Sequence, residues 1–379
     1  MRILLFGNPS TLHSNLAKGL KELGHEVRCI SNRTGWHRFP AEDICLERRT
    51  DINGKAALAE YLLRMLPILR KCKGFDIVQL HHPMFLELRG THMRPFYNYL
   101  RRHNRRMVLG AFGDDCHIVE QMLHSDAFRY SDQKIGDTVR TDMPALMQRM
   151  QWLGDLYHET DICRHVSRDC DHIVACLYEY WACYNNVYPG KLSFIPLPIV
   201  MEDTPQDFSA GEKVRLFIGI QKERSEVKGT DIMLRAAQAI VSDFPHLAEL
   251  RIVENVPYGE YKRIMEGSDA ILDQLYSYTP SMNSLLAMSK GIINIGGGEP
   301  ESYGIIDEKE LRPIINVQPS YDSVYAGLKD LVLHRDRIPV LKRQSVEYVR
   351  RHHDYLSVAR TYESLYRKLL GERSENGKS

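Results

Sequence analysis

Two cations ahead of a helical pattern form the first group that could do chemistry. Arg224 and Lys228 lie in the segment 219–231, between the apolar run 214–218 and a helical pattern that begins near Ile232. Cations close to a helix N-terminus make an anion site, because the helix dipole and the free backbone N–H groups already favour negative charge. A diphosphate that gains charge as it departs needs such a clamp. The alternative is a solvated loop in which the lysine has no role.

Two later loops combine small polar residues, glycines and carboxylates. The first contains Ser281, Asn283 and Ser284, and the second contains Gly297, Glu299 and Glu301. The hydroxyl and amide side chains at the start of a helix could cradle phosphate, or they could serve only as helix caps. The glycines allow a ligand to approach the backbone closely, and Glu299 could accept hydroxyl groups of a ribose or hexose. The alternative for this loop is a tight turn with exposed carboxylates.

Polar residues also follow strands in the first half of the chain. Gly7 ends the apolar run 2–7, His81 follows 75–80, and Asp115 follows 107–112. A histidine or aspartate in such a place could hold a sugar hydroxyl. His81 could equally be a neutral, hydrogen-bonded histidine, and Asp115 could be the cap of the next helix. We expect no metal at 113–115.

The elements that must position these residues alternate regularly between short apolar runs and helical patterns. This alternation predicts an α/β fold with two open, parallel sheets, and ligands bind such sheets beyond the carboxyl ends of the strands. A polar segment at 200–212 separates the two halves, which gives domains at 1–200 and 213–345. A long helix is expected at about 141–160. The last helical pattern, 346–371, has an apolar stripe that must be buried somewhere.

Composition excludes several classes of protein. The 379 residues include 50 Lys and Arg and 49 Asp and Glu, so no basic excess points to a nucleic-acid partner. The eight cysteines form no Cys-x-x-Cys pair, which argues against a zinc site and a disulfide framework and favours a reducing, cytoplasmic setting. The chain enters a strand at once rather than a signal peptide, and no apolar run approaches the roughly 18–20 residues of a membrane span. The basic cluster at 101–106 is either a solvated helix face or a peripheral contact with a membrane or polyphosphate.

Several segments resemble the glycosyltransferases of family 4. The matching segments are Lys228-Gly-Thr-Asp231, Ser268-Asp269-x-x-x-Asp273 and Leu286-Ala-Met288-x-x-Gly291, with further likeness at 75–81, 113–115 and 195–198. Together these segments extend over most of the chain, and their order and spacing support the resemblance. The resemblance implies the glycosyltransferase B architecture, in which two Rossmann-like domains face a cleft and the C-terminal helix crosses back to the N-terminal domain.

The resemblance also implies a function. The second domain would bind a nucleotide-sugar donor (a UDP- or GDP-sugar), and the first would bind a glycan or lipid-linked acceptor in surface polysaccharide or glycoconjugate biosynthesis. Transfer would retain the anomeric configuration and need no metal or cofactor. The family's cationic pair falls on Lys228 and, more loosely, Arg224, and the loop at Gly7 would lie near the donor phosphates. A cytoplasmic protein with a peripheral contact at the inner membrane face would fit. Two other functions stay open: a nucleotide-sugar 2-epimerase and a non-catalytic nucleotide-sugar-binding protein.

One departure from the family concerns donor recognition. Family members carry two glutamates eight positions apart around the second loop, and these positions are Tyr278 and Leu286 here. Neither side chain can replace a carboxylate. Glu299, Glu301 and Asp273 are the carboxylates available nearby, and we expect Glu299 to take over the recognition of donor hydroxyls.

Overall fold

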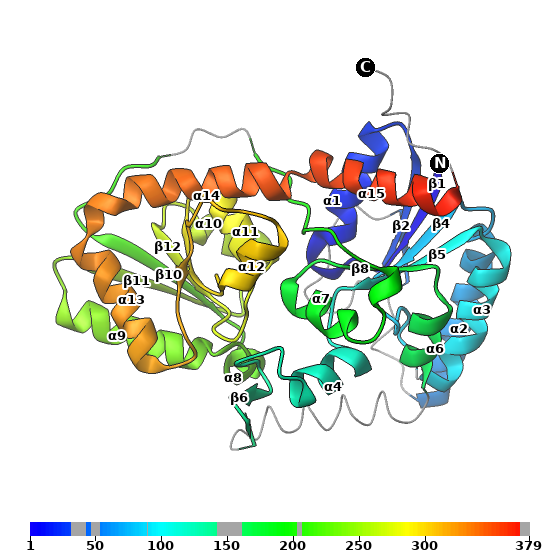
Figure 1. Cartoon of the computed structure of the whole chain (residues 1–379), viewed down its shortest axis with the longest axis horizontal. Coiled ribbons are helices and arrows are strands. Elements are labelled where there is room, and N and C mark those ends of the chain that lie inside the picture. Colours follow the sequence, from blue (N-terminus) through cyan, green and yellow to red (C-terminus); the bar gives the residue numbers. More distant parts are fainter. Residues whose placement is uncertain (32–42, 47–53, 89, 142–160, 203–206, 372–379) are drawn as a thin grey trace.

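The computed structural model describes residues 1–31, 43–46, 54–88, 90–141, 161–202 and 207–371, and these form two α/β halves (Figure 1). The helix predicted at about 141–160 lies outside the described residues. The first half holds a seven-stranded sheet in the order β3-β2-β1-β4-β5-β8-β9, and the second a five-stranded sheet in the order β11-β10-β12-β13-β14. All paired strands within both sheets are parallel. The predicted fold class is therefore confirmed.

The bounds of the elements follow the predicted rhythm closely. The first half contains β1 (Arg2–Phe6), α1 (Leu12–Glu22), β2 (Glu26–Ser31), β3 (Ile44–Cys45), α2 (Gly54–Lys71), β4 (Ile77–Leu80), α3 (Gly90–His103), β5 (Arg106–Ala111), α4 (Cys116–His124), the hairpin strands β6 (Lys134–Ile135) and β7 (Thr138–Val139), α6 (Ile162–Asp169), β8 (His172–Ala175), α7 (Tyr178–Asn185) and β9 (Leu192–Phe194). The second half contains β10 (Val214–Ile220), α8 (Ser225–Lys228), α9 (Thr230–Asp243), β11 (Ala248–Glu254), α10 (Tyr258–Met265), β12 (Ala270–Asp273), α11 (Met282–Ser289), β13 (Ile293–Gly296), α12 (Pro300–Ile305), β14 (Ile315–Asn316), α13 (Tyr321–Leu333), α14 (Ile338–His353) and α15 (Tyr355–Leu370).

Both faces of the first sheet are buried, which explains why its central strand β1 is a continuous apolar run from Ile3 to Phe6. On β1, Leu4 and Phe6 belong to one apolar core, and Ile3 and Leu5 belong to the core on the opposite face. Side chains alternate between the two faces of a strand, so a strand covered on both sides needs apolar residues at every position. Polar residues that could bind a ligand are therefore expected in the loops that follow the carboxyl ends of these strands.

The C-terminal segment crosses from the second half to the first, as the resemblance implied, but as two helices rather than one (Figure 1). The break is at Asp354. There the N–H of Ile199 donates to the carbonyl of His353 at 2.7 Å, and the N–H of Tyr355 donates to the carbonyl of Ile199 at 3.1 Å. Asp354 then caps α15 by accepting from the N–H of Ser357 at 2.9 Å. The backbone of Ile199, just before the segment that links the two halves, is thus hydrogen-bonded to the residues on both sides of the break between α14 and α15.

Helix α15 packs tightly on α1 of the first half. A Cβ atom at Gly19 of α1 would lie 2.6 Å from the Cβ of Ala359, so the glycine permits the close approach of the two helices. Helix α14 instead stays with the second half, where Lys342, 2% exposed, lies 2.6 Å from the buried carboxylate of Asp269. Arg215 donates to the same carboxylate at 2.9 and 3.0 Å. Asp269 of the resemblance motif therefore anchors α14 to the second sheet.

Candidate active site at the domain junction

The candidate residues of the second half gather beyond the carboxyl ends of β10, β12 and β13, which are neighbours in the sheet. Lys228 ends the short helix α8, two residues before α9 begins at Thr230, and its side chain is 17% exposed. Its ammonium lies 3.8 Å from the carboxylate of Asp273, the last residue of β12, which is 4% exposed. The sequence placed these residues on separate loops, and the parallel sheet brings them together.

The start of α11 is held by Asp273. The hydroxyls of Ser281 and Ser284 both donate to the Oδ2 atom of Asp273, each at 2.9 Å. Ser281 occupies the N-cap position, but its side chain makes no capping hydrogen bond. Asn283 donates from its amide to the hydroxyl of Tyr261 at 2.8 Å. The two serines are thus oriented by a carboxylate rather than used as caps.

Gly297 has a structural reason to be a glycine. A Cβ atom there would lie 2.1 Å from the carbonyl oxygen of Ser277, so the loop after β13 and the loop after β12 are in backbone contact. Leu286, at the second of the missing glutamate positions, packs on the apolar cluster that includes Phe217 and Met265. The position of Leu286 is therefore a partly buried apolar one on α11, not one that faces the Gly297 loop with a carboxylate.

Arg224 is exposed and ends a 3-10 turn directly before α8. It is among the charges that act on Asp132, a residue of the first half that the sequence did not single out. Burial raises the pKa of Asp132 to about 6, and the cations Arg140 and Arg224 act against that rise. Arg140 itself is buried, stacks 3.7 Å above the ring of Tyr276 and donates to the carbonyl of Glu226 at 2.8 Å.

In the first half, Gly7 and His81 are packed directly against each other. Gly7 has a φ of +86°, and a Cβ atom there would lie 1.8 Å from the His81 ring. His81 Nδ1 lies 3.1 Å from the carbonyl of Phe6. The glycine is therefore required both by its backbone conformation and by the histidine ring. His81 is therefore a hydrogen-bonded histidine at the end of a strand, which is one of the two roles considered from the sequence.

A buried histidine supports the same loop. His13 Nδ1 lies 2.6 Å from the carbonyl of Gly7, and its Nε2 lies 3.1 Å from the amide nitrogen of Gln79. Burial lowers the pKa of His13 to about 4, partly offset by the bond to Gly7. A neutral ring with its proton on Nδ1 satisfies both contacts. Tyr366 of α15 donates to Gln79 at 2.7 Å, so the network links the loop to the last helix.

Asp115 is the N-cap of α4. Its Oδ1 atom accepts from the N–H groups of His117 at 3.0 Å and Ile118 at 3.1 Å, and Tyr184 donates to its other oxygen. The residue is 0% exposed. Of the two roles that the sequence left open, the structure supports the cap.

Glu299 and Glu301 contact the first half. Arg129 donates to Glu299 at 2.6 Å and forms an ion pair with Glu301. Glu299 is 4% exposed and also accepts from the hydroxyl of Tyr130 at 2.7 Å and the amide of Gln318 at 2.6 Å. Burial alone would raise the pKa of Glu299, but these donors lower it below its usual value. Glu299 is thus a fully engaged carboxylate at the junction between the halves.

Glu179, at the start of α7, is a junction residue that the sequence gave no reason to select. Its Oε1 atom accepts from the backbone N–H groups of Tyr278 at 2.5 Å and Thr279 at 3.0 Å, and from the hydroxyl of Ser277 at 2.8 Å. The residue is 5% exposed, and its Oε2 atom is buried with no hydrogen-bond partner in the described structure. The carboxylate therefore sits in a nest of three donors from the opposite half.

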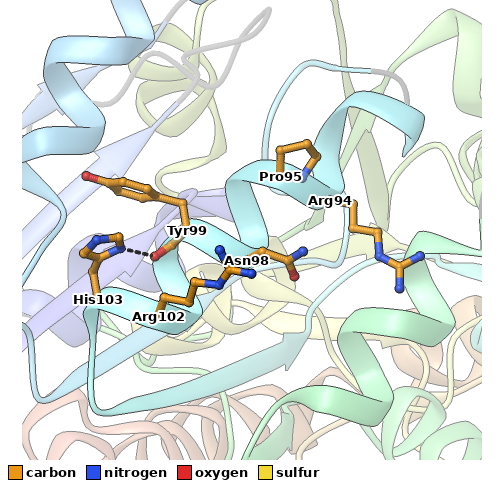
Figure 2. A pocket seen from close by; sticks show the side chains of 6 residues that line it. All are labelled: Arg94, Pro95, Asn98, Tyr99, Arg102 and His103. Atoms are coloured by element: carbon orange, nitrogen blue, oxygen red, sulfur yellow. Dashed lines mark hydrogen bonds between the residues drawn. The ribbon is translucent and has the colours of Figure 1, made fainter.

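Other kinds of site are not indicated. A hollow of about 490 Å³ lies along α3, lined by Arg94, Pro95, Asn98, Tyr99, Arg102 and His103 (Figure 2). All six side chains come from this one helix of the first half, away from the loops described above. In the described ranges no group of three His, Cys, Asp or Glu residues could hold a metal ion. Nor does this part of the chain include a helix with the length and apolar composition to span a bilayer.

Comparison with known proteins places the fold but not the family. The chain matches no known protein family and no curated protein in sequence. Among solved structures it is similar to sucrose-phosphate synthase from Thermosynechococcus elongatus, with a TM-score of 0.62 and 12% identity over 98% of this chain and all of that one. WaaG, a glycosyltransferase involved in lipopolysaccharide biosynthesis, gives a TM-score of 0.60 and 12% identity over 97% and 99% of the two chains. HepE from Anabaena, solved with UDP and glucose, gives 0.59 and 9% over 97% and 100%.

The same architecture also occurs in a second kind of enzyme. A UDP-N-acetylglucosamine 2-epimerase matches with a TM-score of 0.53 and 12% identity over all of this chain and 98% of that one. At these identities the likeness establishes the glycosyltransferase B fold. The chemistry has to be argued from the junction itself.

Proposed function

We propose that this chain is a glycosyltransferase that moves a sugar from a UDP- or GDP-sugar to a glycan or lipid-linked acceptor in glycoconjugate biosynthesis. The observation that supports this most is the group at the carboxyl ends of β10 and β12. There Lys228, Asp273, Ser281 and Ser284 lie within one set of contacts, next to the N-terminus of α11. Anionic groups of ligands bind in this place in open α/β sheets.

In the proposed reaction, Lys228 and Arg224 stabilise the diphosphate as it departs, which is the part a metal ion would otherwise play. Ser281, Asn283 and Ser284 contact the donor together with the backbone at Gly297. The loop at Gly7 and the ring of His81 face the donor from the first half. The sugar is transferred with retention of its anomeric configuration and without a metal.

Recognition of the donor hydroxyls is proposed to involve Glu299, with Glu301 as the neighbouring carboxylate. Glu299 already accepts from Arg129, Tyr130 and Gln318. Asn316 adds a further side-chain hydrogen bond to this carboxylate. Because a carboxylate offers about four acceptor sites, a donor hydroxyl would have to take the place of one of these four donors. Donor binding at Glu299 would thus require an exchange of hydrogen-bond partners.

The test is a panel of nucleotide-sugars with product analysis, preceded by thermal unfolding with UDP, GDP and ADP. A ligand at a hundred times its Kd stabilises the folded state by about 2.7 kcal/mol, which is easily measured. One nucleoside diphosphate should raise the Tm, and its sugar should be transferred or released. If none of the three raises the Tm at millimolar concentration, the donor site proposed here does not exist.

Two other functions make different predictions in the same assay. A 2-epimerase, which shares the fold, would return the C2 epimer of the nucleotide-sugar and no free sugar. A non-catalytic binding protein would be stabilised without any product. Tyr278 and Leu286 at the two glutamate positions favour this second alternative, whereas the contacts of Lys228 favour transfer.

A further inference from the structure

The segment Phe128–Tyr130 of the first half lies against the loops of the second half. The N–H of Arg129 donates to the hydroxyl of Tyr278 at 2.7 Å, and its guanidinium carbon lies 5.1 Å from the centre of the Tyr278 ring. The same guanidinium binds Glu299 and Glu301, and Tyr130 binds Glu299. Three consecutive residues thus join two separate loops of the opposite half.

Aromatic packing reinforces these polar contacts. Tyr278 is 0% exposed. Its ring centre lies 4.8 Å from that of Tyr130, 5.7 Å from that of Tyr178 and 5.8 Å from that of Phe128, and these three rings all belong to the first half. Aromatic pairs at such distances attract each other beyond the effect of burial alone. The position at which the family carries a sugar-binding glutamate is therefore filled by a side chain that packs across the junction.

Charge makes Arg129 the central residue of this contact. Glu299 is buried and Glu301 is half-buried, and both carboxylates face the one guanidinium. The hydrogen bonds to Glu301, with the charge of Glu299 nearby, raise the pKa of Arg129 above its usual value. Without this cation, two carboxylates would lie together at the junction, and Glu299 would keep only neutral donors such as Tyr130, Asn316 and Gln318.

We propose that Arg129 is a positioning residue that holds Glu299 and Glu301 from the opposite half and so keeps the two halves closed on each other when no donor is bound. The consequence for donor binding rests on the function proposed above, whereas the closure itself does not. Donor hydroxyls can reach Glu299 only when one of its protein donors leaves, so the latch formed by Arg129 regulates access to that carboxylate.

The backbone N–H groups of Tyr278 and Thr279 report the closure directly, because they donate to Glu179 across the junction. The experiment is amide hydrogen exchange of the ligand-free full chain, read in fragments that contain these two residues. Arg129→Ala should make them exchange at least tenfold faster, while the amides of β4 and β5 stay as slow as in the parent.

Arg164→Ala is the matched control. The Arg164 side chain is 51% exposed against 53% for Arg129, but it pairs with Glu120 within the first half at 3.3 Å. It should leave exchange at Tyr278 and Thr279 unchanged. If Arg129→Ala exchanges like the parent there, or if the control accelerates exchange equally, the latch is wrong.

A charge exchange across the junction separates positioning from simple packing. Arg129→Glu alone should accelerate exchange, and combining it with Glu301→Arg should return the rate to within threefold of the parent. A double variant as fast as Arg129→Glu, with its core amides still protected, would count against the proposal. Since no donor is present, a chain that shows the latch but binds no nucleotide would refute the proposed function alone. The reverse result would refute the latch alone.

Discussion

Lys228→Ala should separate catalysis from stability more clearly than any other substitution in the junction. A preorganised cation at a developing negative charge typically contributes about 3–4 kcal/mol to the transition state, so turnover should fall a hundredfold or more. The fold should lose far less. The ammonium of Lys228 lies 3.8 Å from Asp273, beyond hydrogen-bonding distance, and the Oδ2 atom of Asp273 keeps its donors Ser281 and Ser284 at 2.9 Å.

The stability cost can be bounded from these contacts. Removing one partner of a fully buried ion pair costs about 3–5 kcal/mol. The Lys228 side chain is 17% exposed, and the carboxylate left behind keeps two hydroxyl donors. We therefore expect the free energy of unfolding to fall by roughly 1–2 kcal/mol, well below the full cost of a buried pair. The effect on turnover should exceed the effect on stability.

Lys290→Ala is the matched control, because Lys290 is 12% exposed and lies 2.8 Å from Glu202 and 3.1 Å from Glu266. It follows the far end of α11, whose eight residues span about 12 Å. The assay measures single-turnover donor consumption at saturating donor, alongside urea unfolding. Lys290→Ala should lower stability and leave turnover unchanged. Turnover of Lys228→Ala within threefold of the parent would show that this lysine is not part of the reaction.

Two further outcomes follow from the burial of single groups. Glu299→Gln should lower the Tm by about 3 °C and Glu301→Gln by about 1 °C or less, because the Glu299 side chain is 5% exposed and the Glu301 side chain 27%, while both pair with the same half-exposed Arg129; equal shifts in calorimetry would contradict this. His13 has a pKa lowered to about 4 in the folded chain, so between pH 6.5 and 4 the unfolded chain binds a proton that the folded chain does not. Stability should fall by up to about 3 kcal/mol on acidification through that window and be unaffected above it. Urea unfolding of His13→Asn should show a smaller fall, and an identical profile would show that His13 is not responsible.

The sequence predicted the elements of both sheets well for a physical reason. Strands buried on both faces are mostly apolar, as in residues 3–6 of β1 and 107–111 of β5, and the polar residue that follows marks the carboxyl end. This rule pointed to the loops that hold Ser281 and Glu299, whereas Lys228 was selected as a cation ahead of a helix and from its match to a family motif. The break at Asp354 could also have been predicted, because aspartate is a common N-cap residue, and Asp354 caps α15 through the N–H of Ser357.

The partners across the junction were not predictable in this way. Arg129 lies in a segment without periodicity, and Glu179 lies in the first turn of a short helix, so neither position differs locally from a solvated one. Their roles come from contacts with residues 98 to 172 positions away in the chain. The sequence could indicate which carboxylates were available near the donor loops. It could not indicate that a cation and a carboxylate of the other half already bind those loops.

The tyrosine at 278 and the latch at Arg129 are physically one feature. The backbone N–H of Tyr278 donates to Glu179, and the carbonyl of Tyr278 accepts from the N–H of Glu299. The Arg129 guanidinium, which lies over the Tyr278 ring, also forms an ion pair with Glu301. Three carboxylates and one guanidinium therefore already surround this position. A glutamate at 278 would add a fourth carboxylate in a site that is 0% exposed, and an uncompensated buried charge costs several kcal/mol. An aromatic ring adds no charge and gains contact with the rings of the first half. A chain that holds its halves together through Arg129 thus has a reason to carry an aromatic ring rather than a glutamate at this position, and Tyr278→Glu should open the junction.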